Sequence, residues 1–80
     1  MTLPELVGEK IRAGIPGSDV SAQGDGSRME IQVVAEAFDG ASRVQRQQLV
    51  YACINEMIAE GSLHAVTIQA LSPTEAAAKR

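Results

Sequence analysis

The pattern of apolar and polar positions begins as a helix. Apolar residues recur every three or four positions between Leu3 and Ile15, the spacing that lines one face of a helix. Thr2 and Glu5 stand three residues apart at the start of this stripe, which is the arrangement of a capping box. Two glycines and a proline follow at positions 14, 16 and 17, and these residue types end helices. We predict a first helix over residues 3–13.

The next pattern alternates and predicts a β-hairpin. Residues 19–23 alternate apolar with polar side chains, and the sequence Gly-Asp-Gly-Ser at residues 24–27 supplies the glycines that tight turns between strands require. A second strand is predicted over residues 29–37. Its alternate apolar residues define a buried face: Ile31, Val33, Ala35 and Ala37.

A second helical pattern fills the centre of the chain. Ser42 and Gln45 have the spacing of another capping box. The apolar stripe that follows runs through Val50, Ile54 and Met57 with helical spacing. We predict the longest helix of the chain here, ending near residue 61.

The remainder predicts a third strand and a short final helix. Apolar and polar residues alternate again over residues 66–71, and Pro73 follows Ser72 in the position that proline favours at the start of a helix. The order of elements is helix, strand, strand, helix, strand, helix. This order predicts an α+β fold in a single domain over residues 1–80, with helices covering one face of a three-stranded sheet.

Composition narrows the functional classes. The chain has 80 residues, a net charge of −3 and one cysteine. The negative charge argues against binding nucleic acid through a broad positive field. A single cysteine forms neither an internal disulfide nor a cysteine-pair metal motif, which fits a reducing compartment. No apolar run approaches the ~18 residues that a membrane span needs, so we expect a cytoplasmic protein that does not contact membranes.

Two side chains could carry metal or thiol chemistry. Cys53 lies on or beside the apolar stripe of the central helix, so a buried, unreactive thiol is a simpler interpretation than a Cys53–His64 nucleophilic pair. His64 falls in the predicted loop before the third strand, where it is either an ordinary surface histidine or a metal ligand. Because one histidine is too few for a metal centre, a site at His64 requires ligands from another molecule. We expect no enzymatic activity.

One stretch is locally basic and rich in hydrogen-bond donors. Arg43, Arg46, Gln47 and Gln48 lie at the start of the central helix, and no acidic residue interrupts residues 41–55. Arginine and glutamine side chains can hydrogen-bond the base edges of DNA, although an ordinary solvated helix face has the same composition. These four residues are therefore candidate contacts to a partner or to nucleic acid.

The same stretch is part of a longer motif. Residues 38–51 read FDGASRVQRQQLVY, residues 63–66 read LHAV, and residues 71–75 read LSPTE. This combination resembles the BolA family, and the resemblance covers nearly the whole chain. The Gly-Asp-Gly-Ser turn and the glutamine pair at positions 47 and 48 look most like the bacterial IbaG branch of that family.

The resemblance implies a KH-like, type II-like α+β fold and a non-enzymatic adaptor for a monothiol glutaredoxin. The two proteins would share a [2Fe-2S] cluster, held by the glutaredoxin cysteine, by glutathione and by the family's C-terminal histidine, which corresponds to His64. Family members often place a second ligand in the loop before the second strand. This chain has Asp25, Ser27 and Arg28 there, and none of them is a usual iron–sulfur ligand. The isolated chain is expected to hold no cofactor and to be a monomer or weak homodimer.

Two functional hypotheses follow from this resemblance. In the first, the adaptor and its glutaredoxin serve iron–sulfur cluster assembly, trafficking or stress-linked regulation. In the second, the chain is a DNA-binding, transcription-related regulator that uses the helix from Arg43 to Gln48.

Overall fold

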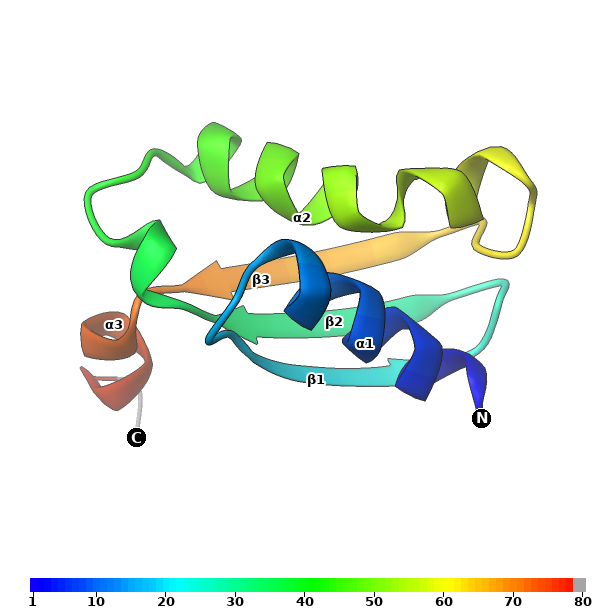
Figure 1. Cartoon of the computed structure of the whole chain (residues 1–80), viewed down its shortest axis with the longest axis horizontal. Helices are drawn as coiled ribbons and strands as arrows, with labels where there is room; N and C mark the ends of the chain where they lie inside the picture. Colours follow the sequence, from blue (N-terminus) through cyan, green and yellow to red (C-terminus); the bar gives the residue numbers. More distant parts are fainter. Residues whose placement is uncertain (79–80) are drawn as a thin grey trace.

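A computed structural model describes residues 1–78 of the chain, which form three α-helices, a 3-10 helix and a three-stranded sheet (Figure 1). The elements in chain order are α1 (Leu3–Gly14), β1 (Asp19–Gly24), β2 (Met29–Val34), η1 (Glu36–Phe38), α2 (Arg43–Ala59), β3 (Val66–Leu71) and α3 (Pro73–Ala78). Apart from η1, which the sequence pattern does not predict, this is the predicted α+β order.

The sheet has the strand order β1-β2-β3. The hairpin strands β1 and β2 are antiparallel, whereas β2 and β3 are parallel. Because parallel neighbours need a crossover connection, α2 returns the chain from the end of β2 to the start of β3. The strand β3 is therefore an edge of the sheet. Polar side chains of α2 donate hydrogen bonds to backbone carbonyls on this edge.

The core lies between the sheet and the two long helices. Burial alternates along β2, where Met29, Ile31 and Val33 are buried and the residues between them are not, so one face of the sheet is covered. The helix α1 contacts β1 and α2, and α2 contacts β3, which places both helices on that face (Figure 1). The other buried side chains of the core include Val7, Ile11, Phe38, Val50, Ile54, Met57 and Leu63.

Capping boxes begin both long helices, as their sequences predict. At α1, the Glu5 amide donates to Thr2 Oγ1 (3.3 Å). At α2, the Ser42 amide donates to Gln45 Oε1 (2.9 Å) and the Gln45 amide donates to Ser42 Oγ (3.1 Å). Each box provides acceptors for amides that have no partner within their helix.

The second strand is shorter than the alternation predicts. It ends at Val34 rather than near residue 37, because the chain turns into η1 directly after the Ala35 amide donates to the Leu71 carbonyl (3.0 Å). This turn buries Phe38 and leaves Ala37 exposed, so the prediction of Ala37 on the buried face is wrong.

Within residues 1–78, none of the helices is long and apolar enough to cross a membrane.

Candidate functional site

His64 lies in the loop that joins α2 to β3, and its side chain is exposed. The backbone of this loop is fixed, because the His64 amide donates to the Gly26 carbonyl in the β1–β2 turn (2.8 Å). Among residues 1–78, the imidazole takes part in no hydrogen bond or ion pair. Both ring nitrogens are therefore without a partner among residues 1–78, although the backbone of the loop is held in place.

The β1–β2 turn packs directly against the His64 loop, at the same end of the sheet (Figure 1). A Cβ atom on Gly26 would lie 2.7 Å from the Ser62 carbonyl oxygen, which is closer than such atoms approach. A glycine at this position is therefore what lets the two loops meet. The sequence separates the turn from His64 by nearly forty residues, and only the parallel pairing of β2 with β3 brings them together.

Asp25, Ser27 and Arg28 lie in that turn, where Asp25 organises the backbone. Asp25 Oδ1 accepts from the Ser27 amide (2.9 Å), the Ser27 hydroxyl (2.6 Å) and the Arg28 amide (3.1 Å). These hydrogen bonds, chiefly that from the Ser27 hydroxyl, lower the pKa of Asp25 below its usual value of 3.8. The polar groups of Asp25 and Ser27 thus serve the turn, while the Arg28 side chain is exposed.

Cys53 lies away from His64, in the interface between α1 and α2. A Cβ atom on Gly14 would lie 2.5 Å from Cys53 Sγ, so the thiol occupies the space that this glycine leaves at the end of α1. Its Sγ donates to the Leu49 carbonyl (3.3 Å), and partial burial raises the pKa of the thiol. Cys53 therefore packs between helices, as the sequence predicts, and a Cys53–His64 pair does not form.

The surroundings of His64 within residues 1–78 offer one exposed imidazole and do not make a complete metal site. Within the described part of the chain, no group of three or more histidine, cysteine, aspartate or glutamate side chains is placed to hold a metal ion. An exposed imidazole without internal partners has the chemistry of a single ligand. The remaining ligands of any centre at His64 would have to come from other molecules.

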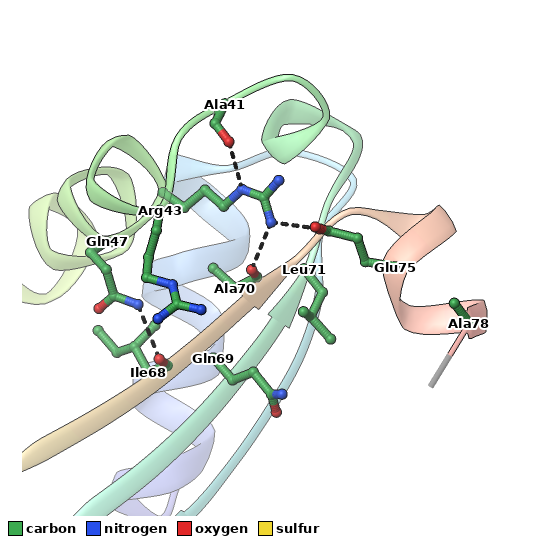
Figure 2. Close-up of a pocket in the computed structure, with 10 residues that line it drawn as sticks. Ala41, Arg43, Gln47, Ile68, Gln69, Ala70, Leu71, Glu75 and Ala78 are labelled. Carbon is green, nitrogen blue, oxygen red and sulfur yellow. Dashed lines mark hydrogen bonds and ion pairs between the residues drawn. The ribbon is translucent and has the colours of Figure 1, made fainter. Parts of the chain in front are cut away.

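Arg46 is placed very differently, beside the far end of β3. Its side chain is only 14% exposed, and its Nε donates to the Ala41 carbonyl (3.0 Å). Its Nη1 donates to the Ala70 carbonyl (3.2 Å) and pairs with Glu75 Oε1 (2.5 Å). The guanidinium therefore joins the start of α2, the edge of β3 and α3. Figure 2 marks its three bonds as the dashed lines that reach Ala41, Ala70 and Glu75.

Of the other three candidate contact residues, one bonds to β3 and two are exposed to solvent. Gln47 is half-buried, and its Nε2 donates to the Ile68 carbonyl on the edge of β3 (3.0 Å). Arg43 and Gln48 are exposed on α2. Of the four residues predicted to contact a partner or nucleic acid, two thus use their side-chain donors within the protein and two present them to solvent.

Glu75 is a member of this arrangement that sequence reasoning missed. The Ser72 amide donates to Glu75 Oε1 (2.8 Å), and the Glu75 amide donates to Ser72 Oγ (3.3 Å), which caps α3. The Ser72 amide and the Arg46 guanidinium together lower the pKa of Glu75 from 4.5 to about 2. The Ser-x-x-Glu spacing signals the cap, but nothing in the spacing signals the ion pair with a residue 29 positions earlier.

Comparisons with known proteins identify the family. A model of the BolA-like protein family matches residues 11–75. The acid stress protein IbaG of Escherichia coli is 47% identical over 62 residues, which cover 78% of this chain and 74% of that protein. The structure of a BolA protein homologue from Coxiella burnetii has a TM-score of 0.80 at 28% identity and covers 96% of this chain and 99% of that one.

A second solved structure agrees with this assignment. A bol-like protein from Babesia bovis has a TM-score of 0.82 at 26% identity, covering 99% of this chain and 94% of that one. Because the family model covers most of the chain and the fold matches over nearly its whole length, the chain belongs to the BolA-like protein family.

Proposed function

We propose that this chain is a non-enzymatic adaptor that binds a monothiol glutaredoxin and shares a [2Fe-2S] cluster with it through His64. The observation that carries the proposal is the exposed imidazole of His64 on a loop whose backbone is fixed by the Gly26 carbonyl. A fixed backbone restricts where the ring can lie, and a ring without internal partners keeps a nitrogen lone pair for a metal.

The shortage of ligands around His64 supports a shared site. A [2Fe-2S] cluster takes four protein ligands, and imidazole replaces thiolate in some centres. This chain supplies one imidazole there, and its only thiol, Cys53, packs against α1 instead. One glutaredoxin cysteine and one glutathione thiol would bring the set to three. The fourth ligand is left unassigned, because Asp25, Ser27 and Arg28 in the β1–β2 turn are not usual iron–sulfur ligands. A histidine ligand would raise the reduction potential of the cluster relative to thiolate ligation.

The similarity to a protein named for acid stress is consistent with a role of this adaptor in stress-linked regulation or in the assembly and trafficking of clusters. We place the adaptor in the cytoplasm, because an unpaired cysteine is typical of proteins from reducing compartments.

The test is a titration of cluster-loaded monothiol glutaredoxin, with glutathione, by this chain. We expect the visible absorption and circular dichroism spectra to change as His64 replaces one ligand, and His64→Ala to abolish the change. Cys53→Ala is the matched control, since it removes the other side chain of metal-ligating chemistry, and it should behave like the unmodified chain.

Two results would sink the ligand assignment. One is a spectrum that stays unchanged on mixing, and the other is a changed spectrum that survives His64→Ala. Because His64 is exposed, its replacement should alter the free energy of unfolding by less than about 0.5 kcal/mol, so loss of the spectral change would not reflect unfolding.

No observation favours the DNA-binding hypothesis to the same degree. Arg46 and Gln47 donate hydrogen bonds to carbonyls of β3. Among the four candidates, Arg43 and Gln48 therefore remain as exposed donors. Phosphate binding needs several cations along one surface, and the chain carries a net charge of −3. We therefore do not propose it as the function, and the experiment below includes a test of it.

A further inference from the structure

A groove runs along the free edge of β3, between the start of α2 and α3 (Figure 2). It has a volume of about 730 Å³, and its lining includes Arg43, Gln47, Ile68, Ala70, Glu75 and Ala78. It lies at the end of β3 opposite His64, which precedes the first residue of the strand. The groove is therefore separate from the candidate cluster ligand.

The free edge of β3 has backbone amides that lack hydrogen-bond acceptors. The bonds from the Met29 and Ala35 amides to the carbonyls of Ala65 and Leu71 show that the odd-numbered residues of β3 face β2. Residues of the other parity, Ile68 and Ala70, direct their backbone groups away from the sheet.

The two outward carbonyls are already occupied. The Ile68 carbonyl accepts from Gln47 and the Ala70 carbonyl accepts from Arg46. Within residues 1–78, the amides of Ile68 and Ala70 have no corresponding acceptor. A ligand at this edge would therefore meet hydrogen-bond donors.

The charge of the groove also favours a ligand that carries acceptor groups. Glu75 neutralises Arg46, whereas Arg43 makes no ion pair or side-chain hydrogen bond within residues 1–78. Figure 2 shows the Arg43 side chain extending from α2 toward the Ile68 side of the groove. Although the chain has a net charge of −3, the groove therefore has one uncompensated positive charge among residues 1–78.

We propose that this groove binds an extended, acidic peptide segment of a partner protein. A carboxylate of the segment pairs with the Arg43 guanidinium, and acceptor groups of the segment take the amides of Ile68 and Ala70. Addition of an extended peptide to an exposed sheet edge is a recurring mode of recognition, in which backbone hydrogen bonds give affinity and side chains give specificity. The proposal does not depend on His64 or on a cluster.

A nucleic acid fits the same groove less well. Binding of single strands relies on stacking against aromatic side chains and on several cations along the backbone. No aromatic side chain lines the groove in the described part of the chain, and Arg43 is the cation left uncompensated there. A carboxylate-bearing peptide needs only the charge and the donors that the groove has.

The experiment is a titration of the full ¹⁵N-labelled chain, followed by NMR, with an eight-residue peptide of alternating threonine and glutamate with blocked ends. We expect the amide signals of Ile68 and Ala70 to shift on binding. Arg43→Ala should weaken binding by about fivefold, since it removes a charge-assisted pair. Arg28→Ala is the matched control, because it removes the same charge from an exposed position in the β1–β2 turn and should leave the affinity unchanged.

Several outcomes would overturn the proposal. Unshifted Ile68 and Ala70 signals at millimolar peptide would exclude the groove as the binding site. Equal weakening by Arg28→Ala, or equal binding of a peptide with lysine in place of glutamate, would show that Arg43 does not select a carboxylate. Shifts produced by an eight-nucleotide thymidine strand but not by the acidic peptide would assign the groove to nucleic acid.

Discussion

The two ends of β3 carry polar side chains of opposite status. Before the strand begins, His64 is exposed, and its ring has no partner among residues 1–78. Beside its last residues, Arg46 is mostly buried and makes bonds to Ala41, Ala70 and Glu75. Both residues belong to the motif by which the sequence resembles its family, yet only one of them is left available to another molecule.

This difference teaches how an edge strand uses polar side chains. An unpaired strand edge exposes backbone carbonyls that can pair with other chains, and proteins commonly cover such groups. Here Arg46 and Gln47 cover two carbonyls of β3. At the other edge, Arg12 donates to the Val20 carbonyl (3.4 Å). A basic, donor-rich helix can therefore serve the sheet rather than a nucleic acid.

The largest expected effect comes from breaking the bonds of Arg46. Arg46→Ala should lower the free energy of unfolding by about 3 kcal/mol, because it leaves two backbone carbonyls and the Glu75 carboxylate without their partner. Arg43→Ala, on the same helix but exposed, should change it by less than about 0.5 kcal/mol. Urea denaturation of both variants measures the difference, and equal losses would contradict the contrast between the two arginines.

A smaller effect is expected from the neighbouring glutamines. Gln47→Ala should cost about 1 kcal/mol, since it removes one hydrogen bond to the Ile68 carbonyl at a half-buried site. Gln48→Ala removes an exposed side chain and should fall within about 0.5 kcal/mol of the unmodified chain. The same denaturation measurement applies. An equal decrease in the free energy of unfolding for Gln48→Ala and Gln47→Ala would mean that the hydrogen bond from Gln47 to the Ile68 carbonyl does not stabilise the fold.

The smallest effect concerns the ionisation of Glu75. Its pKa of about 2 lies below the usual 4.5, so its charged form stabilises the folded chain fully above about pH 4.5 and loses this effect as the pH falls toward 2. Glu75→Gln removes the charge at every pH. The denaturation midpoints of the two proteins should differ most near neutral pH and converge on acidification, whereas a constant difference would show that ionisation of Glu75 plays no part.

The candidate ligand could be predicted because its signal is local. A single histidine in a loop after a helix stop is visible in the sequence, and so is the scarcity of other ligands. The packing of the turn against that loop is not visible, because it depends on the approach of Gly26 to Ser62 across the sheet. The expected position of His64 was thus available from the sequence, and its fixed backbone was not.

The roles of Arg46 and Gln47 could not be predicted, for a related physical reason. Their acceptors lie 24 and 21 residues further along the chain, and one-dimensional spacing carries no signal for such partners. The end of β2 shows the same limit. Alternation continues to residue 37, but the strand ends at Val34, because the chain turns into η1 and buries Phe38.

By itself, the sequence determined the order of the elements, their caps and the α+β class, because apolar periodicity and capping residues act over one or two turns of chain. Only the tertiary structure decided which polar side chains form hydrogen bonds within the protein and which remain available to another molecule. That choice depends on where the unpaired carbonyls of an edge strand fall in space, and the crossover through α2 places them beneath Arg46 and Gln47 while His64 remains exposed at the opposite end.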